Sequence, residues 1–77
     1  MSGNDPHVAK IAALIGDPAR ANILRALMDG RARTAKELAH IAGVSAQTAS
    51  GHLARLEKGG LVTVQRQGRH AYFALSG

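Results

Sequence analysis

The sequence predicts a mainly α-helical domain that ends in a β-hairpin. Apolar residues recur at helical spacing through residues 8–58, where capping residues and glycines divide them into four segments. Residues 61–75 change to the alternation of strands. Because 77 residues leave room for only one core, we expect a single domain, which extends over residues 8–75. Residues 1–7 are expected to form a flexible leader before it.

The first two helices are predicted from their apolar spacing and their end signals. The first follows Pro6, ends at Gly16, and has the apolar residues Val8, Ile11, Ala12 and Ile15. Asp17 is a good N-cap for the second, and Pro18 suits a first helical position, where its missing N–H costs nothing. Asp29-Gly30 closes this helix, whose apolar face is Ile23, Leu24, Leu27 and Met28.

The third and fourth helices follow an extended connector over 31–33. Thr34 and Glu37 form a capping box for a short helix, which ends at Gly43 and has the apolar residues Leu38, Ile41 and Ala42. Val44 can plug the turn that follows. Ser45 caps a fourth helix that runs to Lys58, ends at Gly59-Gly60, and has the apolar residues Ala49, Leu53 and Leu56.

The hairpin is predicted from two alternating segments, 61–66 and 69–75, around a Gln67-Gly68 turn. A two-residue loop there places Val64 opposite Ala71 and Val62 opposite Phe73. The opposite face then has Thr63, Gln65, His70 and Tyr72. Because Gln is not ideal in a type I′ turn, a longer loop stays open as an alternative.

This order of elements is that of a winged helix-turn-helix. A short helix, a glycine turn and a second helix form a helix-turn-helix, whose second helix enters a DNA major groove. The basic hairpin directly after it corresponds to a wing. We therefore expect a recognition helix over Ser45–Lys58 in the major groove and a basic wing on the DNA backbone or in the minor groove.

The charge distribution favours a polyanionic partner, and nucleic acid is the commonest. Residues 31–77 have seven Lys/Arg against two Asp/Glu, whereas residues 1–30 have three of each. The whole net charge of +5 therefore comes from the second part of the chain. A basic surface that serves only solubility is the alternative.

Candidate DNA contacts come from the outward face of the fourth helix and from the wing. Gln47 can pair with adenine, and the Thr48 and Ser50 hydroxyls can donate to bases or phosphates. Arg66 and Arg69 flank the hairpin tip and would repel each other unless an anion lies nearby. His52 lies at the edge of the core face, where a structural role competes with a DNA contact. The predicted DNA-binding set is Thr34, Ser45, Ala46, Gln47, Thr48, Ser50, Gly51, His52, Arg55, Arg66, Gln67, Arg69 and His70.

Three segments resemble the ArsR/SmtB family of bacterial winged-helix repressors. They are residues 15–24, residues 37–53 with Val44-Ser45 and Gly51-His52-Leu53, and residues 56–75 with Arg66-Gln67-Gly68-Arg69. The similarity extends from about residue 8 to residue 75. It implies a dimeric repressor that leaves its operator when an effector binds.

The chain departs from that family pattern at three places. Thr34 and Lys36 occupy the positions of the family's Cys-x-Cys metal motif, so that metal sensor is absent. The family's further C-terminal helix has no counterpart before Gly77, so we expect either a DNA-binding fragment of a longer regulator or a chain that has lost that helix, and a weakened homodimer in both cases. Gly51 replaces the usual Arg, so the operator is expected to differ.

Other functional classes fit the composition less well. The chain has no cysteine, no His-x-x-x-His spacing, no phosphate loop and no nucleophile–base–acid set, so we expect no enzyme activity, metal site or cofactor. No apolar run approaches the roughly 20 residues of a membrane helix, and no signal peptide is evident, so a cytoplasmic location is expected. A winged-helix module that binds protein is the alternative function, although the basic wing favours double-stranded DNA.

Overall fold

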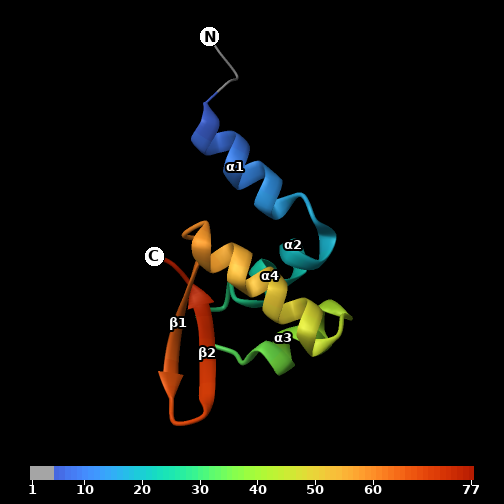
Figure 1. Ribbon diagram of the computed structural model, residues 1–77, viewed down its shortest axis with the longest axis vertical. Helices are drawn as coiled ribbons and strands as arrows, with labels where there is room; N and C mark the ends of the chain where they lie inside the picture. Colours follow the sequence, from blue (N-terminus) through green and yellow to red (C-terminus); the bar gives the residue numbers. More distant parts are fainter. Residues whose placement is uncertain (1–4) are drawn as a thin grey trace.

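The computed structural model describes residues 5–77 and has the predicted order of elements. Its helices are α1 (Pro6–Ile15), α2 (Pro18–Ala26), α3 (Ala35–Ala42) and α4 (Ala46–Lys58). Strands β1 (Val62–Gln67) and β2 (His70–Leu75) form an antiparallel hairpin. Figure 1 shows α1 extending away from one end of the molecule and the hairpin hanging from the other, with α4 between them. The mainly α-helical fold with a hairpin wing is therefore confirmed.

Each helix begins at a side-chain cap. The Asp17 carboxylate accepts hydrogen bonds from the backbone N–H groups of Ala19 and Arg20, and Ser45 accepts one from Thr48. Asp5 caps α1, so the helix begins two residues before the predicted domain boundary at residue 8. The rest of the predicted leader, residues 1–4, lies outside the described residues.

The core lies where α2, α3, α4 and β1 meet. Its fully buried side chains are Ile23, Leu27, Leu38, Leu53, Leu56 and Val62. Leu14 of α1 and Phe73 of β2 pack against this cluster from outside. The core thus fixes α3 and α4 to one another and attaches the wing to both.

Several side chains of the predicted apolar faces lie outside this core. The α-helical part of α2 ends at Ala26, and the tighter turn that follows leaves Met28 73 % exposed. Ile41 is 49 % exposed, although it lies one helical turn after the buried Leu38. On α1, Leu14 makes the core contact, while Val8 and Ile15 are largely exposed.

The hairpin turn lies one residue later than predicted. Val64 pairs with Phe73 and Gln67 with His70, so the two loop residues are Gly68 and Arg69. Gly68 has φ +60°, which suits the first central position of a type II′ turn, and Gln67 is spared the unfavourable conformation. The pairing differs from the predicted one by two positions, so the same side chains still share each face.

A short bridge outside the hairpin was not expected from the sequence. Arg33 donates its N–H to the Phe73 carbonyl at 2.9 Å and accepts from the Phe73 N–H at 2.8 Å. The connector before α3 therefore pairs with β2 on the side opposite β1. This bridge ties the start of α3 to the wing.

Candidate nucleic-acid interface

The turn between α3 and α4 sets the angle at which α4 is presented. Gly43 ends α3 in the left-handed region at φ +70°, and the Val44 N–H then donates to the Ala39 carbonyl at 3.0 Å. Val44 itself is half-buried. These contacts make the predicted helix-turn-helix, with α3 preceding α4 (Figure 1).

The capping box at the start of α3 is present as predicted. The Thr34 hydroxyl accepts from the Glu37 N–H, and the Glu37 carboxylate accepts from the Thr34 N–H at 2.8 Å. This backbone hydrogen bond, with a second one from the Thr34 hydroxyl, lowers the pKa of the Glu37 carboxyl. Thr34 is thus held rigidly beside the wing by its cap and by the neighbouring bridge at Arg33.

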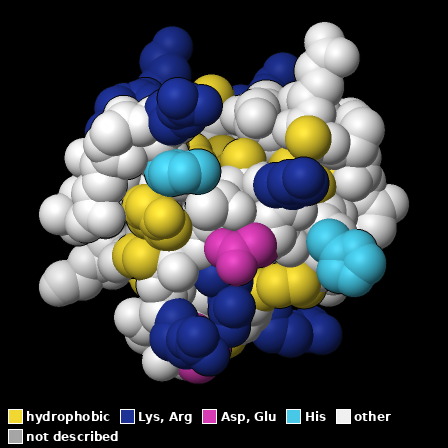
Figure 2. Space-filling view, turned by 90° about the horizontal axis from the view of Figure 1, so that it is seen from below, with side chains coloured by type: hydrophobic (Ala, Val, Ile, Leu, Met, Phe, Trp, Pro, Cys, Tyr) yellow, Lys and Arg dark blue, Asp and Glu magenta, His cyan; other side chains and the backbone are white. Residues whose placement is uncertain are grey.

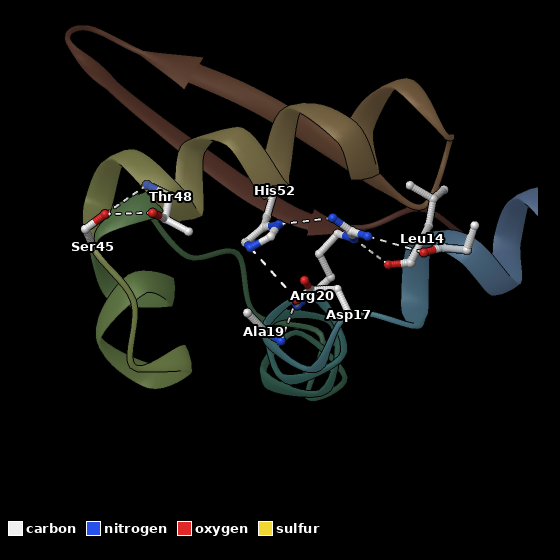
Figure 3. Close-up of polar contacts among 8 residues, drawn as sticks. Leu14, Asp17, Ala19, Arg20, Ser45, Thr48 and His52 are labelled. Carbon is white, nitrogen blue, oxygen red and sulfur yellow. Dashed lines mark hydrogen bonds and ion pairs between the residues drawn. The ribbon is translucent and has the colours of Figure 1, made fainter.

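The first turn of α4 presents a small, polar and exposed surface. Ser45, Ala46, Gln47 and Thr48 are all exposed. The Ser45 hydroxyl donates to Thr48 Oγ1 at 2.9 Å while accepting from the Thr48 N–H (Figure 3). Among residues 5–77, the Thr48 hydroxyl accepts this hydrogen bond and donates none. Within residues 5–77, no hydrogen bond ties down the Gln47 amide.

The rest of the predicted outward face of α4 is also accessible. Ser50, Gly51 and Arg55 are exposed, whereas Ala49 and Leu53 are buried on the opposite side. A Cβ added at Gly51 would meet no atom within 4 Å. The middle of α4 can therefore approach another surface closely.

An open groove of about 440 Å³ joins α4 to the wing. We call it the wing groove. Its lining brings together five of the predicted contacts, from three separate parts of the chain: Thr34, Ser50, Arg66, Arg69 and His70. Ala54 and Glu57 of α4 form part of its wall, so one carboxylate lies among the basic side chains.

The wing places its charges at the exposed end of the hairpin. Arg66 pairs with Ala71, and Arg69 lies in the turn, so the two guanidinium groups do not face each other across the strands as the predicted register implied. Gln67 and His70 are exposed beside them. Figure 2, seen from this end of the molecule, shows Lys and Arg side chains around the surface and an acidic side chain near its centre.

His52 is turned inward from the surface of α4. Its Nδ1 lies 3.2 Å from Arg20 Nη1, and its Nε2 lies 3.9 Å from Asp17 Oδ1 (Figure 3). The side chain is 16 % exposed. Of the two interpretations left open by the sequence, the structural one matches these contacts.

Two residues with a place in this arrangement were missed by the sequence reasoning. Lys36 lines the wing groove from the first turn of α3 and adds a positive charge opposite the wing. Its place between Thr34 and Glu37, at the start of the first helix of the helix-turn-helix, was the sequence feature that could have indicated this position. Arg20 reaches α4 from the start of α2, and nothing local in the sequence indicates a contact over that separation.

Neither a metal site nor a membrane span is found in the described part of the chain. Over residues 5–77, no group of three His, Asp or Glu side chains lies close enough to hold a metal ion. Each helix over those residues is too short or too polar to cross a bilayer.

A family model described as a helix-turn-helix domain matches residues 15–65, which is about two thirds of the chain. The chain belongs to this helix-turn-helix family. The match runs from the end of α1 into β1, so it includes the whole helix-turn-helix. Its boundaries agree with the elements that form the core.

Two relatives of this chain are named as HTH-type transcriptional regulators. The chain is 47 % identical over 72 residues to the uncharacterized HTH-type transcriptional regulator YdfF of Bacillus subtilis. It is 35 % identical over 69 residues to the HTH-type transcriptional regulator CmtR of Mycobacterium tuberculosis. These matches cover 94 % and 90 % of the chain but only 32 % and 58 % of the respective relatives. The chain thus spans about a third of the length of one relative and somewhat under three fifths of the other.

Solved structures confirm the winged helix-turn-helix fold. The chain matches the homodimeric winged helix-turn-helix DNA-binding domain of a possible ArsR-family regulator from Mycobacterium bovis, with a TM-score of 0.82 and 28 % identity. That match covers all of this chain and 77 % of the other. HlyU of Vibrio cholerae matches over all of the chain and 83 % of its own, with a TM-score of 0.87 and 26 % identity. The cadmium sensor CmtR of Mycobacterium tuberculosis matches 90 % of the chain and 71 % of its own, with a TM-score of 0.73 and 33 % identity.

Proposed function

We propose that this chain binds double-stranded DNA as the DNA-binding domain of a transcriptional regulator, with α4 in the major groove. One observation carries the proposal. The first turn of α4 has exposed polar side chains, and from Ser50 onward the wing groove joins the same helix to Arg66 and Arg69, so base-reading and phosphate-binding groups are offered together.

The proposed contacts divide into two kinds. Gln47, Thr48 and Ser50 would read base edges, because amide and hydroxyl groups can pair with the major-groove edges of bases. Residues that position the DNA backbone would be Thr34, Ser45, Arg55, Arg66, Gln67, Arg69 and His70, while Ala46 and Gly51 allow close approach. We leave His52 out of the direct contacts because its ring nitrogens face Arg20 and Asp17.

The wider role is proposed by similarity. We propose repression of transcription in the cytoplasm, because the relatives are named transcriptional regulators and the sequence resembles bacterial repressors. We also propose a homodimer, because the matched domain from Mycobacterium bovis is homodimeric and such dimers bind two half-sites about one DNA turn apart.

The direct test has two steps. Duplexes are first selected by the purified chain from a randomised library, and binding is then followed by fluorescence anisotropy in a salt series. We expect the affinity for a selected duplex to fall steeply with salt, with a logarithmic slope of about −0.9 per phosphate contacted. A folded chain that binds no duplex at low salt would exclude the proposal in favour of a protein-binding module.

A change at Gln47 tests the placement of α4. Gln47→Ala should lose about 1–3 kcal/mol of discrimination at one base position, because a paired hydrogen bond to adenine would be removed. Affinities for single-base variants of the selected duplex measure this loss, with Gln65→Ala as a control on a polar residue of the hairpin. Unchanged discrimination at every position would contradict the proposed orientation of α4.

A further inference from the structure

Arg20 connects three helices through directional hydrogen bonds. From the first turn of α2, its Nε donates to the Leu14 carbonyl at 2.6 Å and its Nη2 donates to the Ala13 carbonyl at 3.3 Å. These carbonyls belong to the last turn of α1, where no helical N–H remains to bond them. Its Nη1 lies 3.2 Å from His52 Nδ1 on α4 (Figure 3).

The Arg20 guanidinium decides which nitrogen of the His52 ring carries the proton. A guanidinium has only donors, so His52 Nδ1 must accept, and in this arrangement the ring is neutral with its proton on Nε2. That N–H is directed toward the Asp17 carboxylate, 3.9 Å away. Asp17 in turn accepts from the Ala19 and Arg20 N–H groups, so the network closes on the start of α2.

The Arg20–His52 contact differs in kind from the other contacts that hold α4. Leu53 and Leu56 anchor the helix through apolar packing, which is not directional and tolerates small rotations. The hydrogen bond at His52 has a required distance and angle, so it fixes rotation about the helix axis. His52 lies one turn after Thr48, on the same side of the helix, and a shift at His52 is therefore transmitted to the first turn.

A second contact joins the same end of α1 to α4. Leu14 packs so closely over Gly59, at the C-terminal end of α4, that a Cβ at Gly59 would collide with the Leu14 side chain. The last turn of α1 thus meets α4 near its middle through Arg20 and His52, and at its end through Leu14. Two separated contacts define an orientation that one contact would leave free.

We propose that Arg20 is a positioning residue for DNA recognition: through His52 it sets the rotation of α4 relative to α1 and α2. This rests on the proposed function of α4 as the recognition helix. Arg20 itself touches no DNA in this arrangement. A movement of α1 would pass to the recognition surface through the same hydrogen bonds.

The test compares four variants on two DNA probes, a duplex selected by the wild-type chain and a random-sequence duplex of equal length. Arg20→Lys keeps the charge but loses the planar fork whose three nitrogens bond α1 and α4 from separate positions, and His52→Leu removes the acceptor. His52→Asn retains an acceptor close to the Nδ1 position. The fourth variant combines Arg20→Lys with His52→Leu. Circular dichroism melting sets a temperature at which all four are folded.

We expect Arg20→Lys and His52→Leu each to weaken binding to the selected duplex by about tenfold, as for residues coupled by direct contact, with little change on the random duplex. The double variant should be no weaker than either single variant, and His52→Asn should recover most of the affinity. In ¹⁵N NMR spectra of the wild type, His52 should give the signature of a neutral ring protonated at Nε2, and Arg20→Lys should remove that preference.

The results that would overturn the positioning role differ from the one that would reject the proposed function. If His52 contacts DNA directly, Arg20→Lys leaves affinity unchanged or its effect multiplies with that of His52→Leu, and the positioning role is wrong. Equal losses on both duplexes, or a wild-type ring protonated at Nδ1, would also overturn it. A wild-type chain that binds neither duplex would reject the proposed function, and the positioning role with it.

Discussion

Gly51 occupies an exposed interior position of α4, where its missing side chain serves no packing purpose in the free protein. Nothing lies within 4 Å of a Cβ added there, and its backbone is helical. Gly51→Ala should therefore stabilise the fold by about 0.5–1 kcal/mol, because alanine loses less conformational freedom on folding. Urea unfolding followed by circular dichroism would measure the change.

Gly43 provides the matched control for that prediction. A Cβ added at Gly43 would also meet no atom within 4 Å, but the φ of +70° at this residue is in the left-handed region. Gly43→Ala should be destabilising by about 1–2 kcal/mol for this reason alone. If both substitutions changed the free energy of unfolding in the same direction, backbone conformation would not be the cause.

Asp17 links stability to acid pH. Hydrogen bonds from the Arg20 and Ala19 N–H groups, with the nearby Arg20 charge, lower the pKa of its carboxyl below the ordinary 3.8. The carboxylate therefore stabilises the fold at pH values above 3.8, and this stabilisation is lost as the pH falls through the lower folded-state pKa.

Asp17→Asn should make the loss of stability in acid shallower while preserving the helix cap, because Asn also caps well. The measurement is the urea midpoint between about pH 3 and pH 7. Some acid sensitivity should remain, since hydrogen bonds also lower the pKa of Asp29 and of Glu37. A pH profile parallel to that of the wild type would contradict the role of this carboxylate.

The wing is the element whose charge can be tested most directly. Changing both Arg66 and Arg69 to Ala should weaken binding to all duplexes alike and flatten the salt slope by roughly two units, because each guanidinium would release about one counterion from the DNA. Anisotropy titrations at several salt concentrations give the slope.

A control with the same loss of charge separates contact from general electrostatics. Lys10 and Arg25 lie on α1 and α2, and neither lines the wing groove. Replacing both with Ala should leave the salt slope closer to that of the wild type. Equal slopes for the two double variants would show that the wing makes no specific phosphate contacts.

The elements themselves could be predicted because their signals are local. The Thr34–Glu37 capping box, the Ser45 cap and the glycine at residue 43 act over three or four residues and form as expected. The predicted hairpin turn was wrong by one residue. Gly68 is the second loop residue of a Gln67-Gly68 turn and the first of a Gly68-Arg69 turn, and the local sequence allows both. The positive φ of Gly68 decides between them.

At the scale of the whole molecule, stability depends on a small shared core. Leu53 of α4 is fully buried among residues of α2, α3 and β1. Leu53→Ala should cost about 2–5 kcal/mol, a large part of the stability of so small a domain. Met28→Ala is the control, since Met28 is 73 % exposed and should change stability by less than about 0.5 kcal/mol. Equal losses in urea unfolding would contradict this assignment of the core.

By itself, the sequence determined the order of the helices, their caps, the hairpin and the basic character of its second half, because neighbouring residues decide these features. Tertiary packing decided which apolar side chains enter the core, leaving Met28 and Ile41 outside. It also decided the pairing of Arg33 with Phe73 and the inward turn of His52 toward Arg20. The wing groove has the same origin, because Thr34, Ser50 and Arg66 meet only after the core has brought α3, α4 and the hairpin together. Such contacts join residues far apart in the chain, and local propensity has no information on which distant partner will be near.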